Sequence, residues 1–79
     1  MTMATETLGN YQLHLIAYEM SGSGKWEPYL KIDKFDEAKQ DFICVLDKHR
    51  VTETPLESYD AAIEAARRAG NQLIREKKI

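Results

Sequence analysis

The segment that decides the fold runs from Tyr11 to Asp33 and reads YQLHLIAYEMSGSGKWEPYLKID. Its first part places apolar residues at every second position, which is typical of a strand with one buried face. One face would carry Tyr11, Leu13, Leu15 and Ala17, and the other Gln12, His14, Ile16 and Tyr18. We therefore predict a strand from residue 11 to residue 18.

The turn sequence Ser21-Gly22-Ser23-Gly24 follows, and its two glycines supply the backbone freedom that a hairpin loop needs. Residues 26–33 should then return as an antiparallel second strand. Its core face would carry Trp26, Pro28, Leu30 and Ile32, and its reverse face Glu27, Tyr29, Lys31 and Asp33. Because proline has no N–H to donate, we expect Pro28 at a sheet edge or at an irregularity.

A third strand is predicted from about Phe42 to Thr52, after a charged connection over residues 34–41. It begins with the apolar run FICVL, which we expect to be its most protected part. Within that run the alternation leaves the register open. Either Ile43 and Val45 or Cys44 and Leu46 would face away from the core, since a slip of one residue exchanges the two sets.

The strongest helical pattern follows Ser58, which is a suitable N-cap with Asp60 in the first turn. Thr54 before Pro55 also fits a helix start, so the helix could begin near residue 55 or near residue 59. One stripe of the helix carries Tyr59, Ala62, Ile63, Ala66, Ala69, Gly70, Leu73 and Ile74. The small residues in this stripe predict a helix that lies close to the sheet.

These elements predict an α+β protein of the order β-β-β-α. A three-stranded antiparallel sheet would carry the C-terminal helix across one face. Residues 1–9 lack periodicity and are predicted to be a flexible N-terminus, and residues 10–79 a single domain.

The element order, the stretch GKWEPYLKI at residues 24–32 and the stretch SYDAAIEAAR at residues 58–67 together resemble small uncharacterised bacterial domains of β-β-β-α type. The resemblance covers about residues 10–76. It implies a fold and carries no activity, cofactor or catalytic residue to this chain.

Composition places the chain among ordinary globular domains, because 43% of its 79 residues are hydrophobic and 30% are charged. The single cysteine excludes an intramolecular disulfide and fits a reducing compartment. No window is apolar enough for a membrane span, and no signal segment is recognisable at the N-terminus. We therefore expect a cytoplasmic protein that does not bind membranes.

The candidates for catalysis are weak. Cys44 could pair with His14 or His49, but the apolar run around it predicts a buried, inert thiol. His14, His49 and Asp47 have no metal-ligand spacing, and no glycine-rich loop precedes a helix to hold phosphate. The sequence predicts a protein that is not an enzyme and has no catalytic residue, metal or cofactor.

The sheet face away from the helix is the better candidate for function, because exposed aromatic and aliphatic side chains mark interaction surfaces. Its candidate residues are His14, Tyr18, Tyr29 and Lys31. We predict a binding module that recognises another protein or a second copy of itself, as a homodimer. The alternative is a nucleic-acid-binding domain that uses this face and the basic side of the helix, with phosphate contacts from Arg67, Arg68 and Arg75. The interspersed acids and the net charge of −2 make that alternative weaker.

Overall fold

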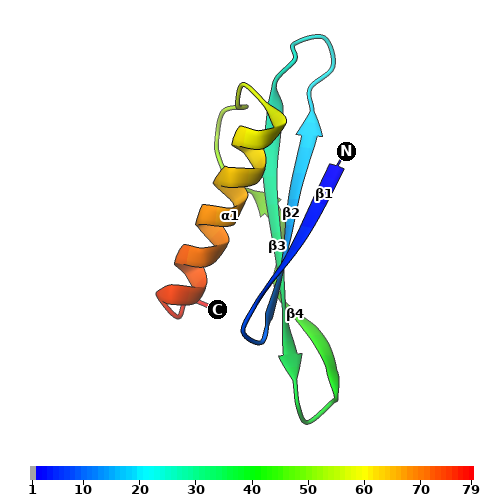
Figure 1. Cartoon of the computed structure of the whole chain (residues 1–79), viewed down its shortest axis with the longest axis vertical. Coiled ribbons are helices and arrows are strands. Elements are labelled where there is room, and N and C mark those ends of the chain that lie inside the picture. Colours follow the sequence, from blue (N-terminus) through cyan, green and yellow to red (C-terminus); the bar gives the residue numbers. More distant parts are fainter. Residues whose placement is uncertain (1) are drawn as a thin grey trace.

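The computed structural model of this chain describes residues 2–79, although not the side chain of Thr2. It is an α+β fold in which an antiparallel sheet, with the strand order β1-β2-β3-β4, is followed by one C-terminal helix (Figure 1). The elements are β1 (Thr2–Leu8), β2 (Tyr11–Glu19), β3 (Trp26–Asp36), β4 (Asp41–Arg50) and α1 (Tyr59–Arg75). The predicted fold class and the C-terminal helix are confirmed.

The prediction of three strands was wrong, because the sheet has four. The N-terminal residues predicted to be flexible form strand β1, which pairs with β2 without interruption from Thr2 opposite Ala17 to Leu8 opposite Tyr11. Gly9 and Asn10 make the two-residue connection, and the φ of +60° at Gly9 suits the first central residue of a type II′ hairpin turn. This glycine–asparagine pair was the sequence signal for the additional hairpin.

The central hairpin of β2 and β3 has the predicted arrangement. Leu13 lies opposite Ile32 and Leu15 opposite Leu30, and all four side chains are buried. Pro28 lies in a central strand, at the point where β4 has ended. Its carbonyl accepts a hydrogen bond from the N–H of Val51, the residue after β4, at 2.9 Å. The N–H and C=O of a strand residue point to the same side, so the N–H that proline lacks would also point past the end of β4, and no β4 carbonyl is left without a donor.

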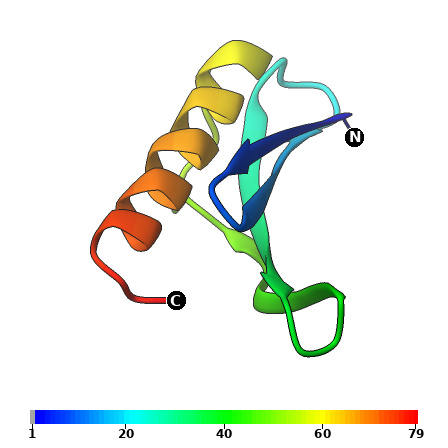
Figure 2. The same ribbon diagram turned by 60° about the horizontal axis from the view of Figure 1, so that its bottom comes forward.

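Helix α1 packs on β2 and β3 and covers one face of the sheet (Figures 1 and 2). Its buried residues are Ala62, Ile63, Ala66 and Gly70, all from the predicted stripe. The helix begins at Tyr59, and the Ser58 hydroxyl accepts a hydrogen bond from the Ala61 N–H at 3.1 Å, so Ser58 is the N-cap. Trp26 packs edge-on against Tyr59 at the same end, with ring centroids 5.5 Å apart.

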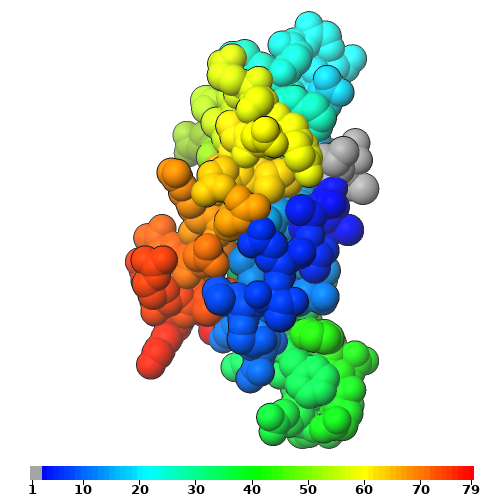
Figure 3. Space-filling model, viewed as in Figure 1, coloured from blue at the N-terminus to red at the C-terminus, as the bar shows by residue number. Residues whose placement is uncertain are grey.

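Strand β4 differs most from the prediction. The FICVL run was expected to be protected, yet Phe42 and Ile43 are 44% and 36% exposed, and Cys44 is exposed. These residues lie in the part of the β3–β4 hairpin that extends beyond the helix, seen as the green segment at the lower end of Figure 3. In the part of the chain that the structure describes, no second layer covers this hairpin end, so its apolar residues have little to pack against apart from the edge-on pair of Phe35 and Phe42.

The register of β4 also follows neither predicted alternative. Two register shifts interrupt its pairing with β3, one between Leu30 and Ile32 and one between Ile32 and Asp33. Val45 and Leu46, which are neighbours in sequence, both pack against the core. Such bulges break the strict alternation of faces, so a period of two could not predict which β4 side chains point inwards.

No helix among the residues described has both the length and the apolar character that crossing a bilayer requires.

Candidate interaction surface

The sheet face opposite α1 is called the open face here. It is defined by three residues of β2, three of β3 and one of β4: His14, Ile16, Tyr18, Tyr29, Lys31, Asp33 and Lys48. The β2–β3 register places Ile16 opposite Tyr29 and His14 opposite Lys31. The four residues selected from the sequence, His14, Tyr18, Tyr29 and Lys31, therefore lie together on one surface.

An aromatic pair occupies the end of the open face near the β2–β3 loop. The rings of Tyr18 and Tyr29 meet edge-on, with centroids 5.0 Å apart and planes at 85°. Such pairs add about 0.5–1.5 kcal/mol beyond the area they bury. The pair lies beside Ile16, which is only 5% exposed although it points away from the helix. The two rings thus pack against each other without any partner present.

Lys48 completes this cluster, although it was not among the residues predicted for this face. Its Nζ donates a hydrogen bond to the Tyr18 hydroxyl at 2.6 Å and lies 5.0 Å and 5.9 Å from the ring centroids of Tyr18 and Tyr29. A cation over aromatic rings is attracted by their quadrupoles. The bulged register of β4 brings Lys48 to this face, and no sequence signal indicates that register.

The other end of the open face is a polar network around Asp33. Its carboxylate oxygens lie 2.7 Å from Lys31 Nζ and 2.9 Å from His14 Nε2. Burial alone would raise the pKa of Asp33, but the hydrogen bonds from Lys31 and His14 outweigh burial and hold the pKa below its usual value of 3.8. The hydrogen bond to Asp33 likewise raises the pKa of Lys31. Asp33 therefore stays ionised and orients both neighbours.

Cys44 lies beside this network, opposite Asp33 in the β3–β4 ladder. Its thiol is exposed, so the predicted burial was wrong, and its Sγ lies 3.2 Å from Asp47 Oδ1. The hydrogen bond to this carboxylate raises the pKa of Cys44 above its usual 9.0. A raised pKa decreases the thiolate fraction near neutral pH, which is the opposite of what a nucleophilic cysteine requires.

The two histidines do not form a metal site. His49 pairs with Leu30, whose side chain points to the core, whereas His14 lies on the open face, so the two rings are on opposite sides of the sheet. Among residues 2–79 no group of three His, Cys, Asp or Glu side chains is arranged to hold a metal ion.

The helix arginines of the nucleic-acid alternative do not form one continuous surface. Arg67 pairs with Glu6 of β1 at 2.8 Å and also with Glu64, and Arg68 pairs with Glu64 at 3.4 Å. The two pairs with Glu6 and Glu64 raise the pKa of Arg67. Arg67 is therefore a link between helix and sheet edge, already neutralised by two carboxylates.

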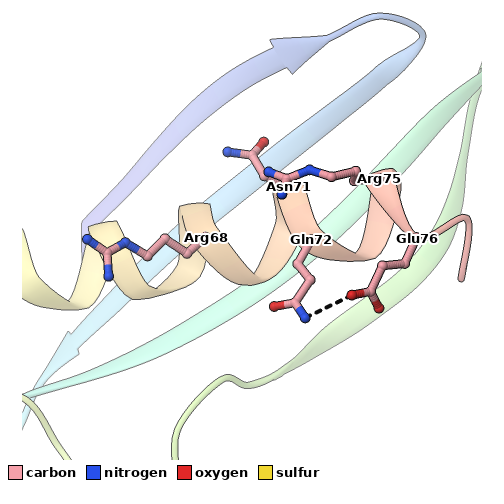
Figure 4. A pocket seen from close by; sticks show the side chains of 5 residues that line it. All are labelled: Arg68, Asn71, Gln72, Arg75 and Glu76. Atoms are coloured by element: carbon pink, nitrogen blue, oxygen red, sulfur yellow. Dashed lines mark hydrogen bonds between the residues drawn. The ribbon is translucent and has the colours of Figure 1, made fainter.

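Arg68 and Arg75 line a shallow surface depression of about 300 Å³, together with Asn71, Gln72 and Glu76 (Figure 4). Gln72 donates a hydrogen bond to Glu76 at 3.0 Å. All five side chains come from the C-terminal part of α1 and the residue after it, so no second element encloses the depression. Its mixed lining of two arginines and one glutamate has none of the enclosure that ligand sites usually show.

Comparison with known proteins found no matching family model, no similar curated protein and no similar solved structure.

Proposed function

We propose that this chain is a non-enzymatic interaction module that binds a protein surface through its open face. The observation that carries the proposal is the cluster of Tyr18, Tyr29 and Lys48, which is already ordered on a sheet face without a second layer. Tyrosine provides a large contact area with few rotatable bonds, and side chains fixed before binding lose less entropy on association.

The chemistry of the partner follows from the charges on this face. Lys31 is paired with Asp33. Beside the defined residues, Arg50 lies opposite Tyr29 and is paired with Glu27 at 2.7 Å, whereas Lys48 contacts two aromatic rings. A fitting partner offers aromatic or apolar area and a carboxylate that reaches Lys48. The open face of a second copy offers the same Tyr18 and Tyr29 rings, so we take self-association as the first form of binding.

Single-stranded nucleic acid is the weaker ligand for this face. Stacking of bases requires an accessible flat ring, but Tyr18 and Tyr29 pack edge-on against each other and Lys48 lies over both rings. On the helix, Arg67 and Arg68 share the carboxylate of Glu64.

The test compares Lys48→Glu with Lys39→Glu by amide-resolved NMR. Both variants change the net charge equally, but Lys39 lies in the exposed turn between β3 and β4. On dilution of the wild type we expect shifts at Tyr18, Tyr29 and Lys31 that persist in Lys39→Glu and disappear in Lys48→Glu.

Titration with single-stranded and duplex oligonucleotides forms the second part. Salt-sensitive shifts at Arg67, Arg68 and Arg75, without concentration-dependent shifts on the open face, would replace the proposal with the nucleic-acid alternative.

A further inference from the structure

Strand β1 is an edge strand with an uninterrupted free side. Its neighbour β2 occupies one side, and among residues 2–79 no helix or strand lies beyond the other side (Figures 1 and 2). In a two-residue hairpin the residues that flank the turn, Leu8 and Tyr11, exchange both backbone hydrogen bonds. The even-numbered residues of β1 therefore bond to β2, and Met3, Thr5 and Thr7 direct their N–H and C=O groups outwards.

The β2–β3 ladder supports this assignment independently. The Phe35 N–H donates to the Asn10 carbonyl at 2.8 Å, which places the even-numbered groups of β2 towards β3 and the odd-numbered groups towards β1. Leu13 and Leu15 of β2 therefore face Glu6 and Ala4 of β1 in hydrogen-bonded pairs.

The opposite edge of the sheet is protected and β1 is not. Strand β4 has two register shifts and carries Asp47, Lys48 and Arg50, and bulges and charges are the features by which proteins block pairing at a sheet edge. Strand β1, TMATETL, has no proline, no bulge and no basic residue. Its one charge, Glu6, is paired with Arg67 of the helix.

We propose that β1 pairs with β1 of a second copy of this chain, antiparallel and centred on Thr5, so that the two sheets join into one. This inference uses backbone groups of a different surface and does not depend on the open-face proposal.

The register follows from the sequence of the strand. Centred on Thr5, all seven residues of β1 find a partner, and Glu6 lies opposite Ala4 of the other copy. The outward residues Met3, Thr5 and Thr7 then form the hydrogen-bonded pairs, which an antiparallel ladder requires. A shift that brings Glu6 opposite Glu6 would place like charges face to face.

The geometry of the joined sheet suits the rest of the molecule. A two-fold axis perpendicular to the sheet keeps both helices on one side and both open faces on the other. Helix α1 lies over β2 and β3, so it leaves β1 accessible to the second copy. Exposed Met3 and Leu8, which are 55% and 42% accessible, would gain neighbours across the seam on opposite faces.

The decisive experiment is hydrogen exchange of the whole chain at low and high concentration. In a monomer the Thr5 and Thr7 amides have no ladder partner and exchange freely, whereas the Leu13 and Leu15 amides are protected by β1. We expect concentration-dependent protection of Thr5 and Thr7, together with a dimer in sedimentation equilibrium.

The variant Thr5→Pro removes the central outward donor without removing a bond to β2. We expect it to weaken dimerisation at least tenfold while Leu13 and Leu15 remain protected, which shows that β1 is still folded onto β2. The variant Thr5→Lys brings two like charges together at the axis and should act similarly, whereas Thr54→Lys, the same change in an exposed loop, should have no effect.

A chain that stays monomeric at millimolar concentration with freely exchanging Thr5 and Thr7 amides would overturn the inference. A dimer that Lys48→Glu abolishes and Thr5→Pro leaves intact would also overturn it, and would assign self-association to the open face. A dimer that Thr5→Pro abolishes and Lys48→Glu leaves intact would support edge pairing and count against self-association through the open face.

Discussion

Gly70 of helix α1 lies against Leu13 of strand β2 so closely that a Cβ atom at position 70 would be 2.5 Å from Leu13 Cδ2. Leu30 of β3 is also near, with its Cδ1 3.4 Å from the same point. Both leucines are buried, so neither can move into solvent. The absence of a side chain at this position sets the distance between the helix and the two central strands.

We therefore expect Gly70→Ala to destabilise the protein although alanine favours the helix by about 1 kcal/mol. Overpacking a filled core costs about 1–3 kcal/mol, and Leu13 would have to change rotamer to relieve the contact. The expected net loss is about 1 kcal/mol in the free energy of unfolding, measured by urea denaturation. Asn71→Ala is the control, because it raises helix propensity away from this contact. A more stable Gly70→Ala variant would show that the helix can move away from the sheet.

Ser58→Ala should cost about 1 kcal/mol, because the Ala61 N–H would lose its side-chain acceptor at the helix N-terminus. Ser58→Asp should retain most of the stability. The matched control is Thr54→Ala, at the alternative start of the helix. Equal losses in urea denaturation for Ser58→Ala and Thr54→Ala would contradict a helix that begins at Tyr59.

With Asp33→Asn, the free energy of unfolding should depend less on pH in the acid range than it does in the wild type. The folded pKa of Asp33 lies below the unfolded value, so its contribution is present above about pH 4 and is lost as pH falls through the folded pKa. We expect Asp33→Asn to be about 1 kcal/mol less stable than the wild type at pH 7, from loss of its hydrogen bonds to Lys31 and His14. The difference should shrink towards pH 3. Glu53→Gln, at an exposed residue, is the control. Its difference from the wild type in the free energy of unfolding, measured by urea denaturation, should not shrink in this way as the pH falls.

Cys44 should react with a thiol reagent in the folded protein, because its side chain is exposed. Its pKa is raised by the hydrogen bond to Asp47, so the rate near pH 8 should be lower than that of an unperturbed thiol. Asp47→Asn removes the carboxylate and should shift the pH–rate profile to lower pH and speed the reaction several-fold at pH 8. A thiol that reacts only after unfolding would contradict the exposed position of Cys44.

The central part of the fold could be predicted because it depends on local periodicity. Alternation around Leu13 and Leu15, and the helical stripe around Ala62 and Ala66, each indicate a buried face without knowledge of the partner element. Four residues of the open face could be selected for the same reason, since His14 and Tyr18 occupy the positions that alternate with the core.

Strand β1 was missed because an edge strand has only one neighbour and contributes little to the core. Met3 is 55% exposed and the strand is rich in threonine, so its hydrophobic pattern is weak. The signal lay in the turn residues Gly9 and Asn10, which join two segments able to form strands. The apolar run from Phe42 led to the opposite error, because it predicted burial for residues that are exposed. Burial depends on a covering element as well as on composition.

The sequence by itself determined the antiparallel pair of β2 and β3, the buried face of each strand, and the small residues that let the helix approach the sheet. It left two possible starts for α1, near residue 55 and near residue 59, and the structure has the start at Tyr59 with Ser58 as the N-cap. Tertiary structure decided that α1 packs mainly over β2 and β3, which leaves the end of the β3–β4 hairpin exposed. It also decided the bulged register that brings Lys48 to Tyr18 and Tyr29. The physical reason is that periodicity records which side of an element is apolar, whereas a register shift and the reach of a covering helix arise only when distant segments pack together.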